Sequence, residues 1–190
     1  MMGVVSARAG AQELIRGYLG GGVSAPIGSL GNYVDPGYNI LLGISARVPF
    51  SGVSVRLDAM FAEFTQAKGV SSYTQMVSGN VNGQYLFGLG AVSPYVFAGP
   101  GYYFLRGDNI AALAWPRPTT NLPPYQSSHF GVDAGAGVRY RFKVVSVFLE
   151  GRDDLVFAGH AQRQYLPITA GVSLPYPWGQ LGTSGVQIGP

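Results

Sequence analysis

The chain has 190 residues, of which 11% are charged and 13% aromatic, and its formal net charge is +3. Ordinary soluble domains carry roughly 25% charged residues. Sparse charge and a mean hydropathy of +0.18 indicate a membrane protein, yet the sequence contains no apolar run of about 18 residues for a spanning helix. Only helices and closed barrels satisfy their backbone groups in lipid, so the composition favours a β-barrel. No basic cluster suits nucleic acid, and without cysteine the chain has neither disulfides nor thiolate metal sites.

The N-terminal segment contains two triplets of the small-x-small form that precedes signal-peptide cleavage, 7–9 and 9–11. It lacks an apolar core of its own. We interpret residues 1–11 as the remnant of a signal peptide, with a plain disordered terminus as the alternative. The barrel is then predicted over residues 12–176, followed by a C-terminal tail, 177–190.

Eight segments have the ten or so residues that a tilted membrane-spanning strand requires. The connections between them alternate between short turns and mostly longer loops, so all the longer loops fall at one end. This alternation of short and long connections predicts an all-β, eight-stranded antiparallel up-and-down transmembrane β-barrel. The predicted strands are Arg16–Gly28, Tyr38–Phe50, Val53–Gln66, Gln75–Gly88, Pro94–Arg106, His129–Phe142, Val145–Gly159 and Tyr165–Tyr176.

The sixth and seventh strands give the clearest pattern, because they fold back on each other about Lys143-Val144. One face of this hairpin is apolar with aromatic residues at both ends. The other face carries charges, with Gly137 opposite Glu150 and Gly135 opposite Arg152. Glycines make room on the charged face, so that face is the crowded inner one and the apolar face is the outer one. This is the polarity of a transmembrane barrel.

The second and third strands follow the same rule about a turn at Ser51-Gly52. With a two-residue turn, Phe50 pairs with Val53 on the apolar face, and Arg47 lies directly opposite Arg56 on the inner face. The fourth strand alternates between apolar and polar residues as clearly. The fifth strand is apolar on both faces, so its register cannot be assigned. Pro100 in the fifth strand demands a bulge or a missing ladder bond.

The inner face collects charges of both signs in nearly equal number. An eight-stranded barrel is just wide enough for its own side chains, and unpaired buried charges cost several kcal/mol, so these residues are expected to pair. The third and seventh strands oppose each other across the ring, and Glu150 is the acid expected to bridge the arginines. We interpret the set as a structural plug; a proton or ion path is the alternative. The predicted lumen network comprises Arg47, Arg56, Asp58, Asp133, Arg139, Arg141, Glu150, Arg152 and Asp154.

The pattern resembles the small eight-stranded outer-membrane barrels of the OmpA, OmpX and OmpW type from Arg16 to Tyr176. The segment Pro94–Tyr102 is similar to a proline-tyrosine strand frequent in that superfamily. The resemblance implies a bacterial outer-membrane location, contact with outer-membrane lipid or lipopolysaccharide, and recognition by the insertion machinery. The last strand carries something similar to the C-terminal assembly signal of the superfamily, at Thr169, Gly171, Leu174 and Tyr176. The tail 177–190 departs from the usual pattern, which ends with that strand.

Two histidines, His129 and His160, flank one hairpin near Ser127, Asp133 and Asp154. A Ser-His-acid site or a two-histidine metal site is conceivable there. The characteristic spacing of lipid-A deacylating barrels is absent, and parity directs these side chains to the lumen. We therefore predict a solvated rim, no enzyme activity, no metal and no cofactor.

The loop 107–128 is apolar, aromatic and rich in proline, with Leu113, Trp115 and Tyr125 as candidate contact residues. It is expected to act as a lid, a lipopolysaccharide contact or, together with the tail 177–190, a contact for another copy of the chain. The function favoured is a non-enzymatic, plugged outer-membrane barrel with a structural or surface-interaction role. The alternatives are a conduit or binder for small hydrophobic molecules, a self-assembling barrel that forms arrays or filaments, and a soluble lipocalin-type barrel.

Overall fold

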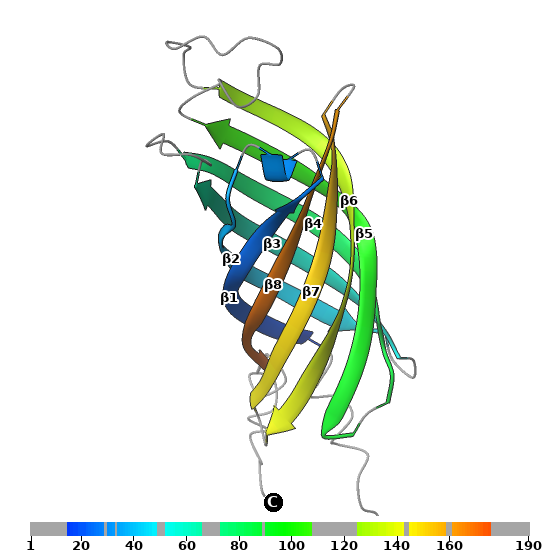
Figure 1. Cartoon of the computed structure of the whole chain (residues 1–190). Coiled ribbons are helices and arrows are strands. Elements are labelled where there is room, and N and C mark those ends of the chain that lie inside the picture. The colour runs from blue at the N-terminus through cyan, green and yellow to red at the C-terminus, as the bar shows by residue number, and fades with distance from the viewer. Residues whose placement is uncertain are drawn as a thin grey trace, which may run out of the picture.

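Eight antiparallel strands close into one barrel in the computed structural model, with each strand hydrogen-bonded to its sequence neighbours and β1 to β8 (Figure 1). The up-and-down order predicted from the sequence is confirmed. The strands are β1 (Ile15–Ile27), β2 (Gly37–Arg47), β3 (Val53–Thr65), β4 (Tyr73–Leu86), β5 (Val92–Gly107), β6 (Tyr125–Phe142), β7 (Val145–Ala158) and β8 (Ala161–Pro175), with a 3-10 turn η1 (Leu30–Asn32) between β1 and β2.

The structure describes most of the barrel and leaves the termini and several connections undescribed. The predicted signal remnant 1–11, the tail 177–190 and His160 lie outside the described residues, as do Leu113 and Trp115. Within the described chain, no helix is long and apolar enough to cross a membrane. The described ranges are 15–28, 30–32, 34–48, 52–65, 73–88, 90–107, 125–142, 145–158 and 161–175.

Side chains alternate between a buried interior and an exposed apolar surface along every strand. The outer surface is built from aliphatic residues through the middle of the barrel, exemplified by Leu42, Val81 and Leu149 at 58%, 50% and 55% exposure. Exposed aromatic residues lie near both ends, as expected for the girdles of a transmembrane barrel. The described aromatic residues of the outer face include Tyr38, Phe104, Phe130 and Phe157 toward one end and Tyr85, Phe87, Tyr140 and Phe142 toward the other.

The two ends of the barrel differ in their connections. Turns between β2 and β3, β4 and β5, and β6 and β7 lie at one end, which we call the short-turn end. At the opposite end, called the long-loop end, β3 and β5 end, β4 and β6 begin, and η1 lies between β1 and β2 (Figure 1). One expected loop is shorter than predicted, because β8 begins at Ala161 and pairs there with Ala158. Tyr125, predicted to lie in a contact loop, is the first residue of β6 and pairs with Gly107.

The β6–β7 hairpin has the predicted register. Gly137 lies opposite Glu150, Gly135 opposite Arg152, and Phe142 opposite Val145. For the described residues of this hairpin, the inner and outer assignments made from the sequence are confirmed by its register and burial.

The β2–β3 hairpin differs from its predicted register by two residues, so the prediction that Arg47 faces Arg56 directly is wrong. Arg47 pairs with Ser54, and Arg56 pairs with Ser45. The ladder ends with the amide of Val48 donating to the carbonyl of Val53 at 2.9 Å. The next residue is proline, which has no amide hydrogen to donate, so the two-residue turn is replaced by a longer connection. A shift of two keeps every side chain on its predicted face.

Strand β5 places its aromatic residues inside, an orientation that the sequence did not decide. Tyr95, Phe97 and Tyr103 are at most 4% exposed, whereas Val96, Ala98 and Phe104 face outward. Pro100 is exposed, and the pairing between β4 and β5 is interrupted at Gly99 and Pro100 and resumes in the same register. Of the two outcomes expected for a proline here, the structure therefore shows missing ladder pairing rather than a bulge.

Candidate functional site

A buried ion pair joins opposite walls of the barrel. Arg56 on β3 donates from Nη1 to Glu150 Oε2 on β7 at 3.0 Å, and from Nη2 to Glu150 Oε1 at 3.3 Å. The same guanidinium contacts Asp58 Oδ2 at 3.1 Å. Arg56 and Glu150 are each 3% exposed, so this contact across the lumen is buried. The pairing across the third and seventh strands expected from the sequence is present.

Arg152 is the centre of the network, because it contacts three carboxylates. Its Nη2 lies 2.5 Å from Asp58 Oδ2 and 3.3 Å from Glu150 Oε1, and its Nη1 lies 3.3 Å from Asp133 Oδ2. The side chain is 1% exposed. A buried charge is tolerated only when its partners compensate for lost hydration, and here each arginine is shared among several acids.

Neutral hydrogen-bond donors complete the solvation of the carboxylates. The amide of Asn82 donates to Asp58 at 3.2 Å and to Asp133 at 3.0 Å. The hydroxyl of Tyr95 donates to Glu150 Oε2 at 2.8 Å. These donors were not identified from the sequence. For Asn82 the inward parity of its strand and its position beside the charged residues were a usable signal, whereas the orientation of Tyr95 could not be assigned. Further donors are Tyr18 to Asp58, Asn80 to Asp133 and Tyr103 to Asp154.

Aromatic rings of β5 separate the network from the barrel wall. The Phe97 ring centroid lies 4.4 Å from the Arg56 guanidinium carbon and 4.9 Å from that of Arg152, both within cation–π range. The inward glycines of β6 accommodate these rings. A Cβ on Gly135 would overlap the Phe97 ring, and one on Gly137 would lie 2.5 Å from the Tyr95 ring. The glycines thus make room for rings that cover the charges, rather than for the charges themselves.

An apolar cluster fills the lumen toward the long-loop end. Residues from β3, β4, β5, β7 and β8 meet there, and Val34 from the β1–β2 connection is 3% exposed and packs among them. Leu30 of η1 packs against the same cluster. The buried members are Val34, Ala62, Phe64, Met76, Tyr103, Leu105, Val156 and Tyr165.

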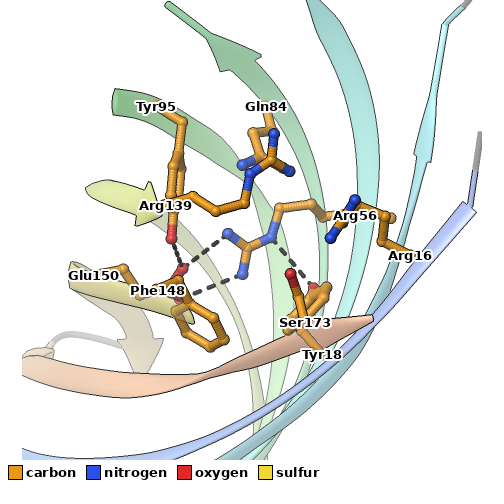
Figure 2. Close-up of a pocket in the computed structure, with 10 residues that line it drawn as sticks. Arg16, Tyr18, Arg56, Gln84, Tyr95, Arg139, Phe148, Glu150 and Ser173 are labelled. Atoms are coloured by element: carbon orange, nitrogen blue, oxygen red, sulfur yellow. Dashed lines mark hydrogen bonds and ion pairs between the residues drawn. The ribbon is translucent and has the colours of Figure 1, made fainter. Parts of the chain in front are cut away.

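The remaining predicted lumen arginines lie toward the short-turn end rather than in the central network. Arg47, Arg139 and Arg141 are partly buried and occupy the last inner positions of β2 and β6 before the turns. Arg139 borders a partly open cavity with about 350 Å³ free of protein atoms, including the part open to solvent. Arg16, which the sequence reasoning did not single out, borders the same cavity (Figure 2). Its Nη2 donates to Ser146 Oγ at 2.8 Å.

The histidine site considered at the rim shows one close contact, between His129 and Ser127. The described residues do not form a Ser-His-acid triad there. His129 Nε2 lies 3.0 Å from Ser127 Oγ at the long-loop end. Asp133, the acid considered with them, instead contacts Asn80, Asn82 and Arg152 in the central network. Within the described part of the chain, no three of His, Cys, Asp and Glu gather as a metal site.

The residues of the candidate assembly signal divide between the two faces of β8. Thr169 is buried and donates to Asn39 Oδ1 at 2.9 Å. Gly171 lies where a Cβ would be 2.6 Å from the ring of Phe148. Leu174 is 49% exposed on the outer face, and residue 176 lies outside the described chain. Recognition of this segment by the insertion machinery remains a prediction.

Comparison with known proteins finds likeness in structure alone. No family model and no curated protein sequence matches the chain. Neisserial surface protein A aligns with a TM-score of 0.64 and 15% identity, covering 85% of this chain and 97% of that one. A major outer membrane protein from Thermus thermophilus aligns at 0.55 and 16%, covering 85% and 99%. The N-terminal β-barrel domain of Pseudomonas aeruginosa OprF aligns at 0.50 and 15%, covering 85% and 98%.

Each of these likenesses covers 85% of this chain. They agree with the eight-stranded antiparallel topology and with the apolar outer surface between aromatic girdles. The fold of this chain is therefore that of the small eight-stranded outer-membrane β-barrels, as the resemblance in its sequence implied.

Proposed function

We propose that the protein is a non-enzymatic barrel of the bacterial outer membrane, closed to ion flow and serving a structural or surface-interaction role. The exposed aliphatic belt supports insertion in lipid, because a soluble barrel would present polar side chains there. The solved structures of similar fold come from outer-membrane proteins, one of which is named as a surface protein. Outer-membrane lipid or lipopolysaccharide is the expected surrounding partner, and the outer-membrane insertion machinery the expected assembly partner.

The observation that carries the proposal is the contact of Arg56 with Glu150 across the lumen. This pair lies at the centre of the barrel, and the apolar cluster around Tyr103 fills the lumen beyond it. An ion would have to displace buried charge pairs and then cross an apolar layer, both of which are costly. A plugged lumen of this kind supports a role for the outer surface and the rim rather than for a pore.

Planar-bilayer recording tests the proposal against the conduit alternative. The wild-type protein is expected to give no steady ion current after insertion, with insertion verified by the heat-modifiable gel mobility of protein recovered from vesicles. Arg56→Leu combined with Glu150→Leu removes the cross-lumen pair but keeps the apolar cluster, and is expected to remain closed. Steady wild-type current of porin size would reject the plug. Saturable transfer of a small hydrophobic probe into vesicles would favour the conduit or binder.

Self-assembly into arrays or filaments rests on the loop 107–128 and the tail 177–190. Their candidate contact residues Leu113 and Trp115 lie outside the described chain, so this alternative stays a prediction from the sequence.

A further inference from the structure

One acid lies on the outer, lipid-facing side of the barrel wall. Asp153 stands on β7 between Arg152 and Asp154, whose side chains are buried inside the barrel at 1% and 0% exposure. Side chains alternate along a strand, so Asp153 faces outward, beside the exposed Ala134 of β6. On the outer face of β8, Gln164 Nε2 donates to both carboxylate oxygens of Asp153, at 2.9 and 2.8 Å. We call Asp153 and Gln164 the outer polar pair.

The outer polar pair lies well inside the apolar belt. Phe157, which belongs to the aromatic girdle at the long-loop end, is four positions farther along β7 than Asp153. A strand rises about 3.3 Å per residue and barrel strands tilt by about 40°, so Asp153 lies about 10 Å below that girdle. Toward the short-turn end, Leu149 and Val147 on the same face are 55% and 46% exposed. Acyl chains offer no hydrogen-bond partner at this depth.

A second outward acid shows why this depth matters. Glu63 on β3 accepts from Gln75 Nε2 on β4 at 2.9 Å, which is a contact of the same chemical kind. Glu63, however, lies directly opposite Tyr38 of the aromatic girdle and two residues from the end of β3. Lipid headgroups and water reach the level of the girdle and can bind both side chains there. The outer polar pair lies below that level, and an ionisable residue held within a membrane indicates a functional contact.

A second copy of the chain supplies matching groups at the matching depth. Every copy inserts with its short turns on the periplasmic side, so every copy carries the outer polar pair at the same height. The side chain of Gln164 makes no other hydrogen bond within the described chain, which leaves one amide hydrogen and the carbonyl oxygen for a partner. About a two-fold axis along the membrane normal, each Gln164 can donate to Asp153 of the other copy, which closes a ring of four side chains. The two carboxyl groups of this ring can share one proton, as closely spaced carboxyl groups do, so the contact does not oppose two full charges.

Small residues flank the outer polar pair and allow two barrel walls to approach. Ala134 lies beside Asp153 on β6, and Ala25 on the outer face of β1 lies beside Leu166 of β8. A two-fold axis at the seam between β7 and β8 places β6 of one copy against β1 of the other, so an alanine flanks the contact on each side. Small side chains let backbones come close enough for polar groups to meet within a membrane.

We propose that the outer polar pair is the centre of a lateral dimer interface, formed within the membrane by β6, β7, β8 and β1 of two copies of the chain. The inference rests on the insertion in lipid proposed above. It goes beyond that proposal, because the contact is made by the barrel wall and needs neither the loop 107–128 nor the tail 177–190. In excess detergent each barrel occupies its own micelle, so the dimer is to be measured in a bilayer.

Disulfide cross-linking of the full-length chain in lipid vesicles tests the interface, because the chain has no cysteine of its own. Leu155 lies on the outer face two residues from Asp153 and directly opposite Gln164, so Leu155→Cys places one sulfur close to the axis of the dimer. Oxidation is expected to give a cross-linked dimer at a high ratio of lipid to protein. Leu57→Cys, on the outer face of the opposite wall, is the matched control and is expected to give only the yield of random collisions.

Three further changes, each made together with Leu155→Cys, separate a polar contact from random encounter. Asp153→Leu is expected to lower the yield to that of Leu57→Cys, while the barrel still folds because an apolar side chain suits the lipid face. Asp153→Asn is expected to keep the cross-link, because a carboxamide also pairs with Gln164. Glu63→Leu changes the net charge by the same amount as Asp153→Leu and is expected to leave the yield unchanged.

Heat-modifiable gel mobility identifies the chains that are folded in the vesicles. Folded chains that cross-link equally at Leu155→Cys and Leu57→Cys overturn the dimer and leave the proposed membrane barrel intact, with headgroups and water drawn down to Asp153 in place of a second copy. Unchanged yield in Asp153→Leu, or equal losses in Asp153→Leu and Glu63→Leu, also overturns the proposal. Failure of the wild-type chain to insert rejects the proposed function and the dimer with it.

Discussion

Arg152→Leu tests whether the central charges stabilise the barrel as one network. Arg152 contacts Asp58, Asp133 and Glu150 at 2.5–3.3 Å while 1% exposed. Its removal leaves four inward acids around the single guanidinium of Arg56, so we expect a loss of about 3–5 kcal/mol, the cost of breaking a buried ion pair. Glu150→Gln removes one acid and leaves Arg56 its contact with Asp58 at 3.1 Å. We expect a smaller loss there, about 1.5–3 kcal/mol, for weakened hydrogen bonds to charged groups.

Urea titration of protein folded into lipid vesicles, followed by far-ultraviolet circular dichroism and gel mobility, measures both losses. The double variant Arg152→Leu with Asp58→Asn should recover part of the Arg152→Leu loss, because it removes one of the carboxylates left in excess. A purely packing role for Arg152 predicts no recovery. Equal losses in Arg152→Leu and Glu150→Gln, or strictly additive losses in the double variant, would refute the account of a shared charge network.

Three further predictions concern the wall, the glycines and assembly. Val138→Arg places a charge on the lipid face near mid-membrane and should cost about 2–4 kcal/mol in vesicle unfolding; unchanged stability would contradict the assigned outer face. Gly135→Ala should lower the urea midpoint of unfolding, because the added Cβ overlaps the Phe97 ring. Gly151→Ala should leave the midpoint unchanged, because no atom lies within 4 Å of its added Cβ. Equal midpoints in the two variants would show that β5 relaxes freely. Deletion of 177–190 should leave a folded monomer that sediments without higher assemblies, and identical assembly with and without the tail and with Trp115→Ser would exclude the self-assembly alternative.

The sequence was sufficient for the β6–β7 hairpin because several constraints agree there. The turn is two residues long, the outer face is continuously apolar, and the inner face alternates charge with glycine. Each constraint independently selects the same register, since a slip of one residue would move Glu150 and Arg152 into lipid. The same reasoning placed Arg56 and Glu150 on opposing strands at similar heights, and the structure brings them to 3.0 Å.

The β2–β3 register was less determined because a slip of two residues preserves the inner and outer faces. The decisive feature was the proline at position 49, which cannot donate a ladder hydrogen bond. Strand β5 was ambiguous for another reason: both of its faces are apolar, so hydropathy does not separate them. What selects Tyr95 and Phe97 for the interior is the space left by Gly135 and Gly137 on β6, a signal that exists only between paired strands.

Height within this barrel can be read from the distance to a turn, and that height separates two groups of inward charged residues. Arg47 and Arg141 lie at the ends of β2 and β6, beside the short turns, whereas Glu150 and Arg152 lie several residues above the turn between β6 and β7. The upper group balances its arginines with acids, because Arg56 and Arg152 both contact Asp58 and Glu150. The lower group, with Arg139, occupies the last inner positions before the turns. A substitution at Arg139 therefore leaves the contacts of Arg152 with Asp58, Asp133 and Glu150 in place. Stability should consequently fall less in Arg139→Gln than in Arg152→Leu, which a lumen whose side chains served only as filler would not produce.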